Sequence, residues 1–326
     1  MSGQRSWVEE FAEQLRAPAR GNEDYPPVFR PLTQGPGVRQ RRAFDPALKN
    51  FARGFVAGDP DFADPTLGAR WRAARRVAMH QVLSAVAYSE WGAQLVLRGS
   101  VLMRGWFGDQ AREPGDLDFV VTPPELMITD GRADELFTGI VAEVRRQPAT
   151  REGVRVAADE VSTAHIWTYE RAPGRRLMFP WYAPGLPPGT IQLDAVFNET
   201  LPEPPEPTGV PVAPGHAPVV VNAVGPEQSL VWKLLWLATD CYPQGKDLYD
   251  AVLLAERVTV SWQRVQEALA TEPGKFNVVD FGPDTLHLLG VDWDEFIDHH
   301  PEFAGTERES WYERLAVALR PSYDAR

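Results

Sequence analysis

The chain has 326 residues, a formal net charge of −12, 44% hydrophobic residues and 24% charged residues, which excludes a disordered or fibrous protein. At roughly 150 residues per domain, its length predicts two units. No apolar run reaches the roughly 18 residues of a membrane span, the charged N-terminal segment lacks the apolar region of a secretory signal, and the single cysteine excludes an intramolecular disulfide. We therefore expect a cytoplasmic protein.

The first half of the chain alternates between helical and extended patterns. Residues 1–65 have a mixed pattern and predict an N-terminal extension. Apolar residues at three- and four-residue spacing then predict helices, and short apolar runs predict strands. The helices are expected over 66–92, 101–107 and 131–147, and the strands over 94–97, 116–121, 165–169, 191–197 and 219–221.

The proline-rich segment 201–218 is expected to be a loop, and the pattern after it is helical. Pro226 opens one predicted helix at its favoured first position, and a second is expected from about Gly245. This order predicts an α/β fold, with a small mixed-sheet core over 66–225 and a helical C-terminal domain over 226–326.

Paired carboxylates follow a Gly-Ser turn in the predicted core. Gly99 and Ser100 stand between a strand and a helix, where backbone N–H groups and a hydroxyl can bind a phosphate. Asp116 and Asp118 share one face of a strand, and a divalent cation would relieve their repulsion because hard cations prefer carboxylate oxygens. The pattern favours a nucleotide and metal site over the alternative, a solvent-exposed turn.

A single acidic residue, Asp194, interrupts the apolar strand predicted over 191–197. A buried, unpaired carboxylate is energetically costly, so Asp194 needs a partner. A metal shared with Asp116 and Asp118 would serve. The alternative is a strand edge where Asp194 meets water or an arginine.

The helices predicted after Pro226 carry two of the four lysines. Lys233 lies in an otherwise apolar segment, so its ammonium either extends to solvent or has a fixed anionic partner. Lys246 and Asp250 lie one helical turn apart, with Asp247 beside them. The alternative for this second group is an ordinary surface ion pair.

Taken in order, these residues resemble the DNA polymerase β-like nucleotidyltransferases, and within them the AbiEii/AbiGii toxin nucleotidyltransferases, which include the MenT-type toxins. The similarity rests on Gly99-Ser100, Arg112 four residues before Asp116-Leu117-Asp118, Asp194, Lys233, and Lys246-Asp247-Leu248-Tyr249-Asp250. It covers roughly residues 90–257. One departure is that Glu113 to Gly115 replaces the Ser or Thr common near the first aspartate.

The resemblance implies transfer of a nucleoside monophosphate from an NTP to an acceptor hydroxyl, with release of pyrophosphate. It implies two Mg²⁺ or Mn²⁺ ions held by Asp116, Asp118 and Asp194, and these aspartates form the expected catalytic set with Lys233 and Asp247. The nucleotide-binding residues that it implies are Gly99, Ser100, Arg112, Lys233, Lys246 and Asp250.

The same resemblance implies that the acceptor is a tRNA 3′ end and that a cognate antitoxin neutralises the enzyme. Two arginine groups are candidates for binding the RNA backbone, or are solvated helix faces. They are Arg70, Arg72, Arg75, Arg76, Arg98, Arg104 and Arg112, and Arg145, Arg146, Arg151, Arg155, Arg171, Arg175 and Arg176. The competing hypotheses are transfer to a small molecule or protein side chain, and a non-catalytic interaction module.

Overall fold

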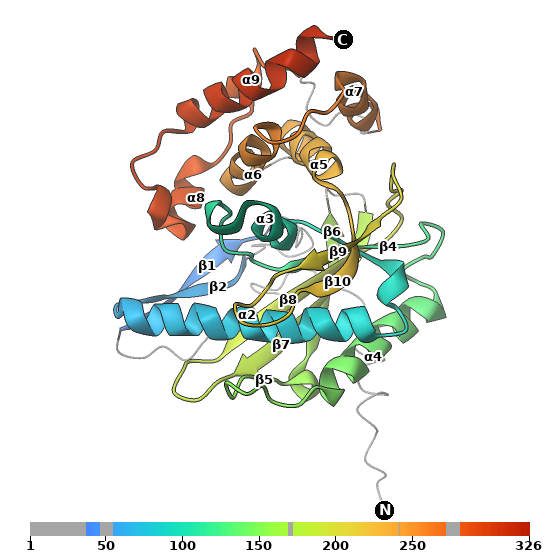
Figure 1. Cartoon of the computed structure of the whole chain (residues 1–326), viewed down its shortest axis with the longest axis vertical. Helices are drawn as coiled ribbons and strands as arrows, with labels where there is room; N and C mark the ends of the chain where they lie inside the picture. The colour runs from blue at the N-terminus through green and yellow to red at the C-terminus, as the bar shows by residue number, and fades with distance from the viewer. Residues whose placement is uncertain (1–36, 46–54, 169–171, 241, 272–280) are drawn as a thin grey trace, which may run out of the picture. The chain divides into compact units, whose positions relative to one another are not determined.

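The computed structural model describes residues 37–45, 55–168, 172–240, 242–271 and 281–326. The chain divides into two compact units (Figure 1). The first unit comprises the described residues up to Gly105 together with Glu113–Ala223. The second unit comprises Trp106–Arg112 and Val224–Arg326. Most of the N-terminal extension expected over 1–65 lies outside the described residues. Its described part includes a two-stranded antiparallel sheet of β1 (Val38–Phe44) and β2 (Phe55–Phe62).

The first unit is built on an eight-stranded mixed sheet. Its strand order is β5-β7-β8-β4-β3-β10-β9, and β6 also pairs with β7. The strands are β3 (Leu95–Arg98), β4 (Leu117–Val121), β5 (Arg155–Val156), β6 (Ser162–Thr168), β7 (Ala172–Tyr182), β8 (Gly189–Val196), β9 (Glu206–Val210) and β10 (Val219–Ala223). At its centre, β4 runs parallel to β8 and antiparallel to β3.

Helices cover this sheet and complete its core. They are α2 (Pro65–Tyr88), α3 (Ser100–Phe107), whose last two residues are in the second unit, and α4 (Gly131–Arg146). The Asp64 side chain caps α2 by accepting the Thr66 N–H, with Pro65 in the first turn. The long helix α2 packs against β8, β10 and α4 (Figure 1). Its buried face therefore covers part of the sheet.

The α/β fold class is confirmed, and two strands depart from the prediction. The proline-rich segment expected to be a loop contains β9, where Pro207 is tolerated because β9 is an edge strand. The long strand β7 was not singled out, although the sequence has an extended pattern over 154–198. Its prolines and adjacent arginines hide the period-two apolar pattern on which strand prediction depends.

The second unit is helical. Its helices are α5 (Pro226–Thr239), α6 (Gly245–Ala255), α7 (Trp262–Ala270), α8 (Trp293–His299) and α9 (Arg308–Asp324). Tyr249 on α6 packs against the rings of Phe296, Phe303 and Trp311, with centroid distances of 5.7, 4.5 and 4.9 Å. Within the described ranges, none of the helices combines the length and apolar character that a membrane span requires.

Candidate active site

Three aspartates converge at the centre of the first unit's sheet. Asp116 comes immediately before β4, Asp118 lies on β4, and Asp194 lies on the neighbouring parallel strand β8. Asp118 and Asp194 are register partners, so their side chains leave the same face of the sheet. One carboxylate oxygen from each aspartate lies within 4.8 Å of the other two. The convergence expected from the sequence is therefore present, and oxygen donors so arranged suit a hard divalent cation.

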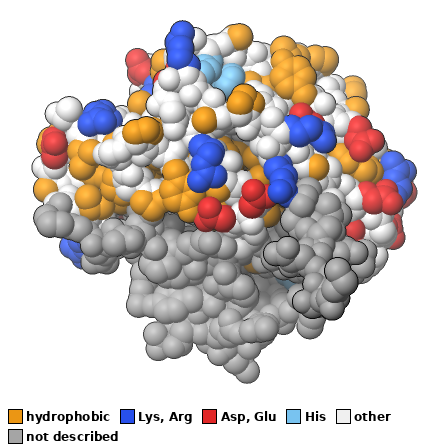
Figure 2. Space-filling model, turned by 90° about the horizontal axis from the view of Figure 1, so that it is seen from below, with side chains coloured by type: hydrophobic (Ala, Val, Ile, Leu, Met, Phe, Trp, Pro, Cys, Tyr) orange, Lys and Arg blue, Asp and Glu red, His pale blue; other side chains and the backbone are white. Residues whose placement is uncertain are grey.

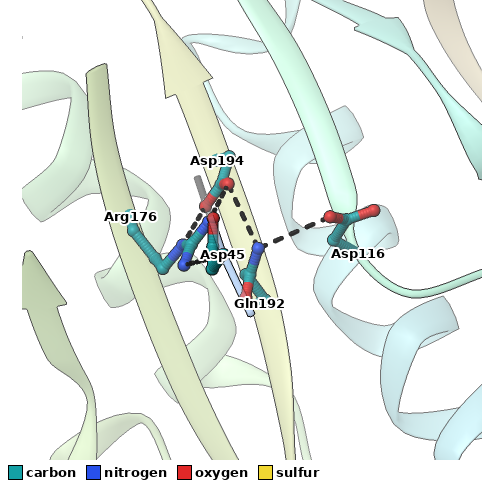
Figure 3. A network of polar contacts seen from close by, with 5 residues as sticks. All are labelled: Asp45, Asp116, Arg176, Gln192 and Asp194. Atoms are coloured by element: carbon teal, nitrogen blue, oxygen red, sulfur yellow. Dashed lines mark hydrogen bonds and ion pairs between the residues drawn. The ribbon is translucent and has the colours of Figure 1, made fainter. Parts of the chain in front are cut away.

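Arg176 on β7 holds the third of these carboxylates (Figure 3). Its Nε donates to Asp194 Oδ1 at 2.8 Å and its Nη2 to Oδ2 at 2.7 Å, while Nη1 donates to Asp45. Gln192 Nε2 donates to Asp194 Oδ2 at 3.1 Å and lies 3.4 Å from Asp116 Oδ2. Asp194 is buried and paired with an arginine, so it combines features of both interpretations of the sequence: an arginine contact and a place in a carboxylate cluster.

Burial and pairing act in opposite directions on these two groups. Burial alone would lower the pKa of Arg176, but Asp194 and Asp45 outweigh it and raise that pKa well above its ordinary value. Burial raises the pKa of Asp194, and Arg176 opposes this rise. The pair is thus a desolvated ion pair held by a bidentate contact. Sequence reasoning missed this role for Arg176 because it depends on the register of β7 against β8, which an extended pattern does not reveal.

The Gly-Ser turn lies directly against the cluster. Gly99 adopts a φ of +85°, and a Cβ on it would lie 2.7 Å from Asp118 Oδ2, so glycine is required for both conformation and space. Ser100 begins α3, is 3% exposed, and its Oγ is buried without a hydrogen-bond partner among the described residues. A buried hydroxyl in this state suits a phosphate oxygen as acceptor.

The segment before Asp116 is anchored on α2. Arg75, 3% exposed, donates from Nη1 to the Pro114 carbonyl at 2.6 Å and from Nη2 to the Gly115 carbonyl at 2.5 Å. Arg76 forms a two-bond ion pair with Glu113 at 2.8 and 2.5 Å. The residues that replace the usual Ser or Thr are thus held by two arginines from a helix.

Burial removes several members of the two arginine groups, for which the sequence allowed either an RNA-binding surface or a solvated helix face, from both interpretations. Five of the arginines are buried: Arg75, Arg98, Arg112, Arg175 and Arg176. Arg145 pairs with Asp159, and Arg146 with Glu143, while Arg171 lies outside the described residues. On the face drawn in Figure 2, basic side chains are scattered among acidic and apolar ones. Arg70, Arg72, Arg151 and Arg155 are exposed.

The second unit contains a separate buried network of charges. Lys233 Nζ on α5 lies 2.6 Å from Asp247 Oδ1 and 3.0 Å from Asp250 Oδ2 on α6. Arg112 Nε and Nη2 donate to the two Asp250 oxygens at 3.1 and 2.9 Å. Lys233 therefore has fixed anionic partners and does not extend to solvent. Lys246 is exposed, and Asp250 pairs with Arg112 and Lys233.

Each side of this network stabilises the charged form of the other. Burial alone would raise the pKa of Asp250, but Arg112 and Lys233 outweigh it and lower that pKa below its ordinary value. Burial alone would lower the pKa of Lys233, but Asp247 and Asp250 raise it. Two cations and two carboxylates thus compensate one another inside the helical unit.

Comparisons with known proteins identify the family of the chain. No curated protein matches the chain. Among solved structures, it is similar to the MenT4 nucleotidyltransferase toxin of Mycobacterium tuberculosis H37Rv, with 17% identity, a TM-score of 0.47, and coverage of 79% of this chain and 87% of that one. The family model of the nucleotidyl transferase AbiEii toxins of type IV toxin–antitoxin systems matches residues 81–317. This match spans more than half of the chain and includes the three aspartates and the charged network of the second unit, and the protein therefore belongs to the AbiEii nucleotidyltransferase toxin family.

Proposed function

We propose that the chain transfers a nucleoside monophosphate from an NTP to an acceptor hydroxyl, and that the reaction depends on a divalent metal ion at the aspartate cluster. The observation that carries this proposal is the convergence of Asp116, Asp118 and Asp194 within 4.8 Å, beside the Gly99-Ser100 turn. Family membership supports the nucleotidyl-transfer chemistry. The oxygen-only donor set supports Mg²⁺ or Mn²⁺.

The residues of the first unit have distinct parts in this proposal. The cluster of Asp116, Asp118 and Asp194 forms the metal site, and a divalent ion there would neutralise phosphate charge and favour deprotonation of the attacking hydroxyl. Ser100 Oγ and the backbone N–H groups that open α3 would bind phosphate oxygens of the NTP. Gly99 lets the turn approach the Asp118 carboxylate.

For the second unit we propose a phosphate-binding role for the lysines. Lys246 is exposed and can act as a point charge on a phosphate. Asp247 and Asp250 orient the Lys233 ammonium, and Arg112 fixes Asp250. Lys233 and Asp247 remain the proposed catalytic pair of this unit, with Arg112 and Asp250 as their support.

The test is incubation of the full chain with each labelled NTP, Mg²⁺ and total cell extract. We expect Mg²⁺-dependent release of pyrophosphate and transfer of label, and a loss of roughly 1,000-fold in Asp118→Asn. Asp159→Asn is the matched control, because Asp159 is an exposed aspartate of the same unit that pairs with a surface arginine. A wild-type protein that consumes no NTP, or an Asp118→Asn protein that matches it, would refute the proposal.

The acceptor that we propose is the 3′ end of a tRNA, acted on by a toxin that a cognate antitoxin neutralises. The resemblance to MenT-type toxins supports it, and exposed Arg70 and Arg72 on α2 offer phosphate contacts. Label should then enter the tRNA fraction, and labelling should fall steeply with salt and in Arg70→Glu/Arg72→Glu. Label found only in protein or in small molecules would move the assignment to those acceptors.

A further inference from the structure

Four charged residues form an ordered row across the centre of the sheet. Arg176 on β7 is the register partner of Asp194 on β8, which pairs with Asp118 on β4, which pairs in turn with Arg98 on β3. Arg98 is 4% exposed and forms an ion pair with Glu199 at 2.5 Å. Two carboxylates thus stand side by side with a buried guanidinium next to each in the register.

The two carboxylates of this row have different surroundings. Asp194 receives both Nε and Nη2 of Arg176 and the Gln192 amide, which together occupy three of the about four acceptor sites of a carboxylate. The remaining Arg176 donor with a described contact, Nη1, goes to Asp45 and not to Asp116 or Asp118. The guanidinium therefore pairs with the buried aspartate of the cluster, Asp194. It does not contact Asp116 or Asp118, which are half-buried.

Arg176 is not placed to withdraw when a metal arrives. It is 2% exposed, and it is held by its bidentate contact with Asp194 and by its contact with Asp45. If a metal displaced it from Asp194, a desolvated guanidinium would lose its main partner, and breaking one side of a buried ion pair costs about 3–5 kcal/mol.

We propose that Arg176 is a resident cation of this centre: it neutralises Asp194, so that the divalent metal ion is held by Asp116 and Asp118, with Asp194 acting as the anchor of Arg176. This inference rests on the metal site proposed above and assigns different roles to its three aspartates. Mg²⁺ is commonly held by one or two carboxylates and completed by substrate phosphates, so Asp116 and Asp118 suffice. Arg176 is a positioning residue in this scheme.

The test is titration of the full chain with Mn²⁺ alone, followed by calorimetry and by the electron paramagnetic resonance of free Mn²⁺. Arg176→Met should bind Mn²⁺ at least about tenfold more tightly or bind an additional ion, because the released Asp194 carboxylate becomes available and a neighbouring positive charge is removed. Arg176→Lys, which keeps the charge, should stay close to wild type. Arg175→Met is the matched control, since Arg175 is an equally buried arginine on the opposite face of the same strand.

The decisive variant is the charge-neutral pair Arg176→Met/Asp194→Asn. It should bind Mn²⁺ within about threefold of wild type, because it removes an internally compensated pair, and such replacements are often neutral for stability. Mn²⁺ binding at least about tenfold weaker than wild type in this variant would show that Asp194 is a required metal ligand and would overturn the inference, as would wild-type binding in Arg176→Met. If Arg176→Met does not fold, the charge-neutral variant decides alone.

Labelled NTP transfer by the same wild-type preparation separates this inference from the proposed function. If wild type transfers the label but the charge-neutral variant binds Mn²⁺ weakly, only the role proposed for Arg176 is refuted. Absence of both transfer and Mn²⁺ binding in wild type defeats the function itself, and the inference with it.

Discussion

The two units differ in how their buried charges are balanced. In the first unit, Asp116, Asp118 and Asp194 converge, and Arg176 pairs with Asp194 and with Asp45. In the second unit, two cations, Arg112 and Lys233, meet two carboxylates, Asp247 and Asp250, at hydrogen-bonding distance. An excess of converging carboxylates indicates a centre completed by an added cation, whereas a balanced network holds the fold and orients its own members.

The comparison predicts the largest stability effect in the balanced network. Asp250→Asn should lower the free energy of unfolding by about 3–5 kcal/mol, because it leaves Arg112 and Lys233 buried without full compensation. Chemical denaturation measures this loss. The matched control is Asp284→Asn, since Asp284 forms an equally bidentate pair with Arg320 on the surface, with its side chain 70% exposed. Similar losses in the two variants would show that burial of the Asp250 network contributes little to the free energy of unfolding.

The pKa shifts in the same network predict the range of pH over which it stabilises the folded protein. The lowered pKa of Asp250 means that its contribution is present above the unfolded-state pKa and is lost as pH falls through the folded-state value. The raised pKa of Lys233 means that its contribution is present below its unfolded-state pKa and is lost at strongly alkaline pH. Acidification below about pH 4 should therefore lower the Tm of wild type more than that of Asp250→Asn. Parallel Tm curves would contradict this account.

A smaller effect is expected where α2 anchors the first unit's aspartates. Arg75→Met removes the donors to the Pro114 and Gly115 carbonyls and should cost about 2 kcal/mol of unfolding free energy. Arg72→Met, an exposed position on the same helix, should stay within about 0.5 kcal/mol of wild type. Denaturant unfolding of both proteins measures the difference, and equal values would mean that Arg75 behaves as a surface residue.

The sequence was sufficient for the parts of the fold that follow local patterns. The apolar period of α2, the strands around Asp118 and Asp194, and the start of α5 at Pro226 all lie where the patterns predicted. The convergence of the three aspartates was also foreseeable, because Asp116 and Asp118 lie at one predicted strand and Asp194 interrupts another apolar strand.

The partners of the buried charges were not foreseeable, because they depend on strand register and on contacts distant in sequence. Arg176 meets Asp194 only because β7 pairs antiparallel with β8 at that register, and the bounds and register of β7 were not predicted. Arg112 meets Asp250 across 138 positions of sequence. Arg75 was assigned to a solvated or RNA-facing surface because a helix pattern alone does not show that an arginine reaches a neighbouring loop.

The aspartate cluster of the first unit should bind a divalent cation and the balanced network of the second unit should not, and Mn²⁺-dependent thermal unfolding tests this difference most directly. Mn²⁺ at about 100 times its Kd should stabilise wild type by about 2.7 kcal/mol and raise its Tm. Asp247→Asn should start from a lower Tm and keep the Mn²⁺-induced rise, whereas Asp116→Asn/Asp118→Asn should lose it. A rise that persists without Asp116 and Asp118, or that disappears in Asp247→Asn, would contradict the account.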